Sequence, residues 1–324
     1  MEQTSRVLHP LFREKIMSAQ QAAQWIQDGM TLGVSGFTGA GYPKALPTAI
    51  AEKAKAEHAA GKPFAVRIIT GASTAPECDG VLAEANAVSF RSPFQSDPIL
   101  RKSINAGNID YQDMHLSHIE QQIRQGFYGA FDVAIIEATA ITADGKIVPS
   151  MGIGHDNEVL KAASKVIIEV NEAQNAKLEG MHDVQFDIGV PPNRKPINIT
   201  KPFDHIGTPY LECDINKVVA VVLTNGRDRN SKFAEPDDSS KRIAAQIIDF
   251  FSHEVKAGRL PANLLPLQSG VGNVANAVLA GLQDSPFENL TGFTEVLQDG
   301  MLELILSGKM QWAARAEWAC SPER

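Results

Sequence analysis

The segment GFTEVLQDGM, residues 292–301, places one carboxylate inside an apolar and β-prone run. Glu295 interrupts the stretch LTGFTEVL, and an unpaired carboxylate is costly to bury. The ordinary explanation for a lone glutamate is a strand residue that faces solvent or pairs with a lysine. A chemical explanation competes with it, because a carboxylate that lies opposite hydrogen-bond donors can act as a nucleophile.

A glycine turn upstream of Glu295 favours the chemical explanation. The segment LQSGVGNVANAV lies about 25 residues earlier, and its pattern predicts a strand, a tight turn and a helix. In parallel α/β sheets, ligand sites gather where strand ends meet such turns. The backbone N–H groups of Val271, Gly272 and Asn273 are therefore candidates for an oxyanion hole that faces the carboxylate of Glu295.

Two other glycine turns suit phosphates or carboxylates, because a turn before a helix presents unpaired backbone N–H groups. Gly36, Gly39 and Gly41 follow the pattern GxxGxG, which differs from the dinucleotide pattern GxGxxG. The segment MGIGHDN comes closer, but Asn157 replaces its third glycine. A nicotinamide enzyme therefore remains a disfavoured alternative, and the lack of a GxxxxGK[ST] motif argues against nucleotide hydrolysis.

Metal chemistry has little support in the sequence. His115 and His118 lie three residues apart, a spacing that suits two ligands on one helix face, but no third ligand stands at a recognisable distance. Capping or surface histidines are the preferred interpretation, and we expect no metal. The three cysteines, which we expect to be reduced, fit neither a zinc pattern nor a disulfide framework; they are Cys78, Cys213 and Cys320.

Alternating strand and helix patterns must position these residues. Val- and Ile-rich runs separated by helical segments predict βα units around a mainly parallel sheet that is buried on both faces. The strand candidates are TLGVSGF, FAVRIITG, FDVAIIEATAI, KVIIEV and KVVAVVL. The helix candidates include SAQQAAQWIQDG, with a capping-box spacing from Ser18 to Gln21, and then LPTAIAEKAKAEHAAG, DPILRKSINAG, HIEQQIRQG and NEVLKAASK.

A polar and turn-rich segment, NGRDRNSKFAEPDDSS, predicts a domain boundary. We therefore expect one domain over residues 1–225 and a second over residues 226–324. The segment SSKRIAAQIIDFFSHEVKAG then predicts a long amphipathic helix. GFTGAGYPKALPTAIA and QSGVGNVANAVLAGL share one strand–turn–helix pattern, which hints that the two parts repeat a single architecture.

Composition limits the classes of function. The 324-residue chain carries a formal net charge of -8, so it offers no broad basic surface for nucleic acid. The N-terminal segment lacks the apolar core of a signal peptide, and the longest apolar run, Val218 to Leu223, is too short to span a bilayer. We expect a cytoplasmic protein that binds neither nucleic acid nor membrane.

Six segments together resemble the acetyl-CoA hydrolase/transferase family, class I CoA-transferases that include succinyl-CoA:acetate and propionyl-CoA:succinate CoA-transferases. The segments are SGFTGAGYPKALPTAIA, TGAS, FRSPFQ, EATAI, LPLQSGVGNVANAVLAGL and TEVLQDGMLELILSGK. One segment alone would carry little weight, whereas six in this order are specific. The resemblance implies a CoA-transferase fold of the NagB/RpiA-like type, with two similar, open, mainly parallel α/β domains and an active site between them.

The resemblance also assigns roles to residues. The family's nucleophile is the glutamate of the last segment, which is Glu295 here, and the turn from Gly270 to Asn273 supplies main-chain donors to the acyl oxygen. The residues that line the acyl and CoA side of the cleft are Gly36, Gly39, Gly41 and Ser73.

An arginine is the candidate for holding the acceptor's carboxylate. We assign Arg229 to this role, because a guanidinium matches a carboxylate bidentately, and Arg227 is the near alternative. Both arginines lie in the polar segment that follows the first expected domain.

The expected reaction is transfer of CoA between an acyl-CoA and a small carboxylate of the acetate, succinate or propionate class. Glu295 would attack the thioester to give an acyl-glutamyl anhydride, and the CoA thiolate would convert that anhydride into a glutamyl-CoA thioester. CoA is a substrate in this scheme, and no permanently bound cofactor is needed. Acetyl-CoA hydrolysis is the leaky variant, in which water reaches the intermediate.

The resemblance has one departure, at the end of the chain. Family members continue through a further α/β segment that completes the second domain and contributes to CoA binding, and the residues MQWAARAEWACSPER depart from the family pattern after Lys309. We therefore expect an incomplete second domain in a homodimer whose activity depends on the missing portion. The alternative is an inactive remnant that binds acyl-CoA or a partner subunit.

Overall fold

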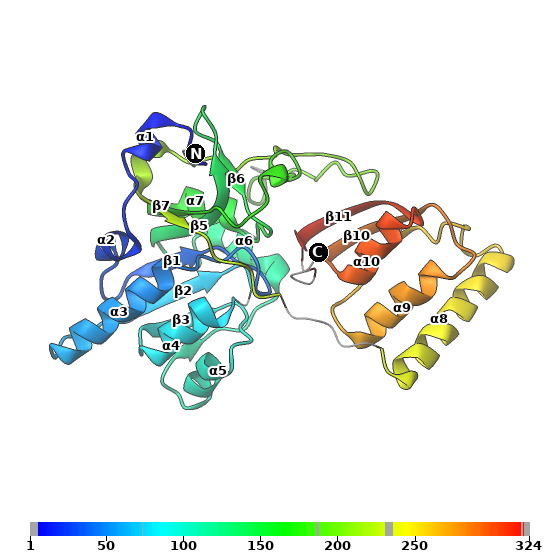
Figure 1. Ribbon diagram of the computed structural model, residues 1–324, viewed down its shortest axis with the longest axis horizontal. Coiled ribbons are helices and arrows are strands. Elements are labelled where there is room, and N and C mark those ends of the chain that lie inside the picture. The colour runs from blue at the N-terminus through cyan, green and yellow to red at the C-terminus, as the bar shows by residue number, and fades with distance from the viewer. Residues whose placement is uncertain (1–5, 73, 186–187, 231–235, 319, 321–324) are drawn as a thin grey trace. The chain divides into compact units, whose positions relative to one another are not determined.

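The chain forms two compact units, shown in the computed structural model of Figure 1. Unit 1 comprises Met1–Ile197 and Ile206–Arg229, and unit 2 comprises Asn198–His205 and Asn230–Arg324. The chain thus leaves unit 1 after Arg229, close to the boundary expected at residue 225. The structure describes residues 6–72, 74–185, 188–230, 236–318 and 320.

Unit 1 is built on an eight-stranded sheet in which every strand except β6 runs parallel to its neighbours. The strand order is β4-β3-β2-β1-β5-β7-β8, and β6 pairs antiparallel with β5. The expected α/β class is confirmed. The strands are β1 (Thr31–Val34), β2 (Val66–Thr70), β3 (Val88–Ser92), β4 (Asp110–Tyr111), β5 (Phe131–Ile141), β6 (Ile147–Pro149), β7 (Ala163–Asn171) and β8 (Val218–Thr224).

The order of the strands creates a topological switch point between β1 and β5. The chain adds β2, β3 and β4 on one side of β1 and then returns to place β5 on its other side. The register of this pair sets Leu32 opposite Val133 and Val34 opposite Ile135. In open parallel sheets, the carboxyl ends of the strands beside such a reversal form a crevice where ligands commonly bind.

Helices cover both faces of the unit 1 sheet, as Figure 1 shows. The residues of β5 alternate accordingly: Val133 and Ile135 join one core, whereas Ala134 and Ile136 join the other. The first core includes α2 (Ala19–Ala22), α3 (Leu46–Ala59), α4 (Val81–Glu84) and α5 (Pro98–Asn105). The second core includes α1 (Pro10–Arg13), α6 (Leu116–Arg124) and α7 (Asp156–Ala162).

Short helical turns complete unit 1. The predicted capping box is confirmed at α2, where the Ser18 hydroxyl accepts from the Gln21 N–H and the Gln21 side chain accepts from the Ser18 N–H. This helix is shorter than its sequence segment, because a 3-10 turn replaces its second half. The short turns are η1 (Ala23–Trp25), η3 (Ala176–Leu178) and η4 (Ile215–Lys217), together with the π-helical turn η2 (Pro76–Gly80).

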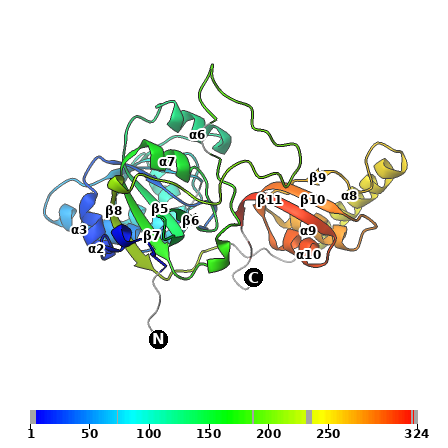
Figure 2. The same cartoon turned by 90° about the horizontal axis from the view of Figure 1, so that it is seen from above.

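Unit 2 has a parallel three-stranded sheet in the order β11-β10-β9. Its strands are β9 (Pro266–Leu267), β10 (Leu290–Leu297) and β11 (Met310–Trp318), and its helices are α8 (Asp238–Lys256), α9 (Asn273–Gln283) and α10 (Asp299–Leu306). The helices lie on one side of the sheet (Figures 1 and 2), where Leu279, Met301 and Leu304 share a core with Leu290. The segment after Lys309, which the sequence analysis left without an element, forms β11.

Whether a helix can cross a membrane depends on its length and its apolar character. In the part of the chain that the structure describes, no helix combines the length and the apolar character needed to cross a bilayer.

Gly33 in β1 permits α7 to lie close to the sheet. A Cβ atom at this position would lie 2.1 Å from Val159 Cγ1, which is an impossible contact. Because the glycine is in a regular strand, packing rather than an unusual backbone angle requires the missing side chain.

We expect the variant G33A to lower the free energy of unfolding by about 1 to 3 kcal/mol, because the added methyl group overpacks the core. Urea denaturation measures the effect. The matched variant V159A removes the two methyl groups that the new side chain meets, so the double variant should be more stable than the sum of the single effects predicts. Strict additivity of the two changes would contradict this packing.

Candidate functional site

The loops at the carboxyl ends of β1, β2 and β6 approach one another through glycines. A Cβ atom on Gly71 would meet the Gly36 carbonyl oxygen at 3.0 Å and the Gly154 Cα at 3.2 Å. Gly41, whose φ is +65°, is crowded as well, because a Cβ atom added there would lie 2.9 Å from Ser150 Oγ. The structure therefore brings the predicted glycine turn of residues 36–41 against the loops that contain TGAS and MGIGHDN.

A buried charge cluster anchors this glycine turn to the sheet. The Lys44 ammonium pairs with the Glu137 carboxylate in β5 and lies 2.9 Å from Asp228 Oδ1. The same Asp228 oxygen accepts the Gly41 N–H at 3.1 Å. Gln174 then bridges the two acids, donating to Glu137 at 2.9 Å and to Asp228 at 2.8 Å. The cluster joins the loops after β1, β7 and β8 to the middle of β5.

Burial sets the proton affinities in this cluster. It raises the pKa of Glu137 to about 8, although the charge of Lys44 opposes the rise. Burial acts to lower the pKa of Lys44, but the charges of Glu137 and Asp228 together raise it. Lys44 therefore stays charged, whereas Glu137 holds a proton more readily than a glutamate in water.

A second buried acid, Glu169 in β7, caps the N-terminus of α3. Its carboxylate accepts the N–H groups of Lys44, Ala45 and Leu46 at 2.5, 3.0 and 2.9 Å. These are the donors that a helix leaves unpaired at its first turn, and a negative charge there also complements the helix dipole. Burial raises the pKa of Glu169, and the three backbone donors oppose that rise.

The sequence analysis missed both of these acids. Glu137 stands in FDVAIIEATAI and Glu169 in KVIIEV, so each is an acidic residue inside an apolar strand. That is the signal used for Glu295, and applying it to every strand would have found them.

A buried ion pair between Arg91 and Asp79 holds the TGAS loop. Arg91, which belongs to the FRSPFQ segment, donates twice to the Asp79 carboxylate, at 3.0 Å in each bond. Arg91 also donates to the Ala72 carbonyl at 3.0 Å, and Asp79 accepts the Thr74 N–H at 3.2 Å. The two neighbours of Ser73 are thus fixed, while Ser73 itself lies outside the described residues.

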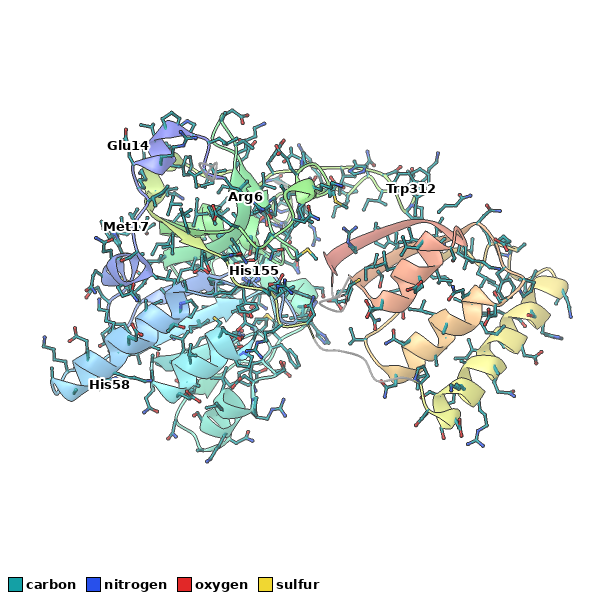
Figure 3. All side chains as sticks on the ribbon, in the orientation of Figure 1. Arg6, Glu14, Met17, His58, His155 and Trp312 are labelled. Atoms are coloured by element: carbon teal, nitrogen blue, oxygen red, sulfur yellow. The ribbon has the colours of Figure 1, made fainter. Side chains whose placement is uncertain are left out.

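The MGIGHDN loop leads into α7, where its polar side chains are buried. His155, labelled in Figure 3, and Asp156 are 1% and 2% exposed. Burial lowers the pKa of His155 to about 3, with the charge of Arg91 adding to the effect, so the imidazole is neutral near pH 7. Because the first residues of this helix, 156–160, are all buried, the geometry gives a dinucleotide no support there.

Arg229 lies beside the glycine turn. Its N–H donates to the Gly39 carbonyl at 2.9 Å, and its side chain, which is 65% exposed, places Nε 2.5 Å from Glu77 Oε1. Arg227 is exposed as well. The structure therefore unites Gly36, Gly39, Gly41 and Arg229 at one end of the unit 1 sheet.

In unit 2, the second glycine turn lies beside the carboxyl end of β10. The Gln298 side chain donates to the Gly270 carbonyl at 2.6 Å, and the hydroxyl of Thr294 donates to the Ser269 carbonyl at 3.2 Å. Gly272 is the N-cap of α9, with φ at +151°. The predicted juxtaposition of this turn with β10 is therefore present, at the carboxyl ends of two adjacent parallel strands.

Glu295 lies one residue from that contact, but its side chain is exposed. Strand alternation directs Thr294 towards the helices and Glu295 towards the other face, where Phe293 is 48% exposed. Within the described ranges, the Glu295 carboxylate has no hydrogen bond or ion pair to a protein group. The Glu295 side chain is thus exposed and has no polar partner among the described residues. A contact between its carboxylate and the N–H groups of the turn remains a prediction.

Two histidines and three cysteines were considered above for metal binding or disulfide formation. His115 and His118 pack edge to face with ring centroids 5.6 Å apart. No group of three or more His, Cys, Asp or Glu side chains that could hold a metal ion occurs among the residues that the structure describes. All three cysteines are free thiols.

Comparisons with known proteins identify relatives over nearly the whole chain. Residues 1–223 match the acetyl-CoA hydrolase/transferase N-terminal domain. The chain is 45% identical to the succinyl-CoA:acetate CoA-transferase of Clostridium kluyveri, over 98% of this chain and 58% of that protein. It is 41% identical to the acetyl-CoA hydrolase of Schizosaccharomyces pombe, over 99% of this chain and 62% of that protein.

A solved structure shares the fold at low sequence identity. The crystal structure of RipA from Yersinia pestis matches with a TM-score of 0.70 and 18% identity, over 97% of this chain and 65% of that one. The chain therefore spans about three fifths of the length of the curated relatives that it matches.

The raised pKa of Glu137 predicts a pH-dependent stability. An acid whose pKa is higher in the folded chain than in the unfolded chain, here about 8 against 4.5, binds its proton more tightly when folded. Its stabilising contribution is fully present below about pH 4.5 and is lost as the pH rises through about 8. The slope for one proton is at most about 1.4 kcal/mol per pH unit.

The comparison variant is E137Q, which cannot titrate. We expect the unfolding free energy of the natural chain, minus that of E137Q, to fall as the pH rises from 5 to 8 in urea denaturation. Titrating groups that do not interact with Glu137, such as Asp237, cancel in this difference. A difference that is constant or rises with pH would refute the assignment.

Proposed function

The chain belongs to the acetyl-CoA hydrolase/transferase family, as its six sequence segments predicted, and we propose that it transfers CoA between an acyl-CoA and a small carboxylic acid. We further propose that Glu295 is the nucleophile and that unit 2 corresponds to the beginning of the second family domain. Acetyl-CoA hydrolysis is the variant in which water replaces the acceptor acid.

The accessibility of Glu295 carries this proposal. The apolar runs of β5, β7 and β10 each contain one glutamate, and two of the three, Glu137 and Glu169, are buried and bound to lysine, amide and backbone donors. Glu295 is the exception: it is exposed, it has no polar partner within the described ranges, and it stands beside a glycine turn. A nucleophile needs that availability, whereas a structural acid does not.

The reaction follows from carboxylate chemistry. Glu295 attacks the thioester carbonyl of the acyl-CoA, the carbon–sulfur bond breaks, and the electron pair leaves with the CoA thiolate. The thiolate, whose thiol has a pKa near 8.5, then attacks the glutamyl carbonyl of the resulting anhydride and releases the first acid. The acceptor carboxylate attacks the glutamyl-CoA thioester, and the same steps run in reverse. Bonds of similar energy are exchanged, so no external energy source is needed.

The two glycine turns supply different parts of the site in this proposal. The N–H groups from Gly270 to Asn273 stabilise the oxyanion that forms at the acyl carbon. The turn of Gly36, Gly39 and Gly41, together with Ser73, lines the acyl and CoA side. Arg229 holds the carboxylate of a dicarboxylic acid, such as succinate, that does not take part in the reaction. The close packing of unit 1 loops supports this role, because a pre-organised backbone orients a substrate with little loss of entropy.

A second candidate function is acyl-CoA binding, or partner binding, without turnover. It is the alternative that the sequence analysis left open, and the chain covers 58% and 62% of the two relatives described above. CoA binding measured by calorimetry, in a chain that does not convert succinyl-CoA and acetate, would support this candidate over the enzyme.

The purified chain should convert succinyl-CoA and acetate into acetyl-CoA and succinate. Trapping with hydroxylamine or borohydride after incubation with acyl-CoA should label Glu295, because both reagents react with a glutamyl thioester. The variant E295Q should lose the label and at least about a thousandfold in rate, as expected for a covalent nucleophile.

The control variant is E288Q, which changes another exposed glutamate of unit 2 and should keep both the rate and the label. Peptide mass spectrometry locates the modification. A label on any other residue, or a label that survives in E295Q, would overturn the assignment of the nucleophile.

A further inference from the structure

Arg229 already holds a carboxylate that belongs to the protein. Glu77 lies in the π-helical turn η2, and its Oε1 is 2.5 Å from Arg229 Nε. Its second oxygen, Oε2, accepts from the Tyr42 hydroxyl at 3.2 Å. One carboxylate is therefore bound by a guanidinium and a phenol, beside the glycine turn of unit 1. The π-helical turn is a rare element that occurs frequently at functional sites.

The backbone of Arg229 is fixed, although its side chain is exposed. The preceding residue, Asp228, is held by Lys44, Gln174 and the Gly41 N–H. The Arg229 N–H itself bonds to Gly39. The guanidinium thus extends from a backbone that is held by hydrogen bonds, and the Arg229 and Glu77 side chains are 65% and 31% exposed.

Tyr42 is suited to donate to a carboxylate. Burial raises the pKa of its phenol, and the charge of Glu77 raises it further, so the hydroxyl keeps its proton near neutral pH. The ring is fully buried, which fixes the position of the hydroxyl. Both groups around Glu77 are therefore hydrogen-bond donors of the kind that a carboxylate ligand requires.

We propose that Glu77 is a specificity-determining residue: its carboxylate occupies Arg229 and must be displaced when the distal carboxylate of a dicarboxylic acid binds there. This rests on the proposed function, in which Arg229 receives the unreacting carboxylate of a dicarboxylic acid. A monocarboxylic acid such as acetate has no distal carboxylate and does not compete with Glu77. The residue therefore lowers the affinity for dicarboxylates and leaves that for monocarboxylates unchanged.

The size of this effect follows from the exposure of the pair. Exposed ion pairs contribute little to stability, and the range measured for them corresponds to a competition of about two- to fivefold in a dissociation constant. Displacement is therefore easy, so Glu77 biases the choice of acid without blocking the site.

The test is titration of the full chain with succinate and with acetate, followed by calorimetry or by NMR shifts. The variant E77Q should bind succinate about two- to fivefold more tightly and bind acetate as before. R229M should weaken succinate binding by about tenfold or more, because a hydrogen-bonded charge is lost. The control is E254Q, which breaks the Glu254–Arg259 pair of the same 2.5 Å length in unit 2 and should change neither affinity.

Several results would overturn the proposal. They are weaker or unchanged succinate binding in E77Q, an acetate affinity that changes by the same factor, unchanged succinate binding in R229M, and no succinate binding to any of these chains. If E77Q does not fold, as judged by circular dichroism, E77A replaces it with the same expected result. Because binding is measured without turnover, a failure of CoA transfer would refute the proposed reaction alone. A failure here would refute the roles of Glu77 and Arg229 and leave the role of Glu295 as nucleophile standing.

Discussion

The buried hydrogen-bonded cluster of Lys44, Glu137 and Asp228 is the interaction on which the geometry of unit 1 depends. It is the point where the turn after β1, the middle of β5 and the loop after β8 meet. A buried charge is tolerated only when its partners satisfy it, and here Gln174 and the Gly41 N–H complete the set. Removing one member would leave the others buried and unpaired, which costs more than the pair contributes.

Glutamates inside apolar strands are buried in unit 1 and exposed in unit 2, and the helices that cover each sheet explain the difference. The unit 1 sheet is covered on both faces, so an acid in β5 or β7 is buried and must find donors nearby. The described helices of unit 2 pack on one side of its sheet, so alternation along β10 can place an acid on the other face, where the Glu295 side chain is exposed. Sequence pattern alone does not distinguish these cases, because all three runs are similarly apolar.

Local patterns gave much of the fold. FDVAIIEATAI corresponds to β5 over its full length, α3 and α8 match their predicted segments, and Ser18 forms the predicted capping box. The polar strand β3 and the Trp-containing β11 were not predicted, because their pairing with neighbouring strands, rather than their own residues, makes them strands.

The candidate site was predictable to a similar extent. The meeting of Gly39 with Arg229 agrees with the grouping expected from the family resemblance, but the partner of Arg229 was not foreseen. Glu77 is 152 residues away in the sequence, and no local pattern specifies a side-chain pair at such a separation. Side-chain pairs between residues far apart in the sequence are therefore what local patterns could not predict.

The third strand of unit 2 has a consequence of its own. β11 pairs with β10 along one side, and among the described residues no strand lies along its other side. A nine-residue parallel edge presents a ladder of unused amide and carbonyl groups, and Trp312, labelled in Figure 3, adds an exposed indole to it. Such an edge is a template for pairing with another extended chain, so we expect β11 to be a site of association between copies of this chain at high concentration.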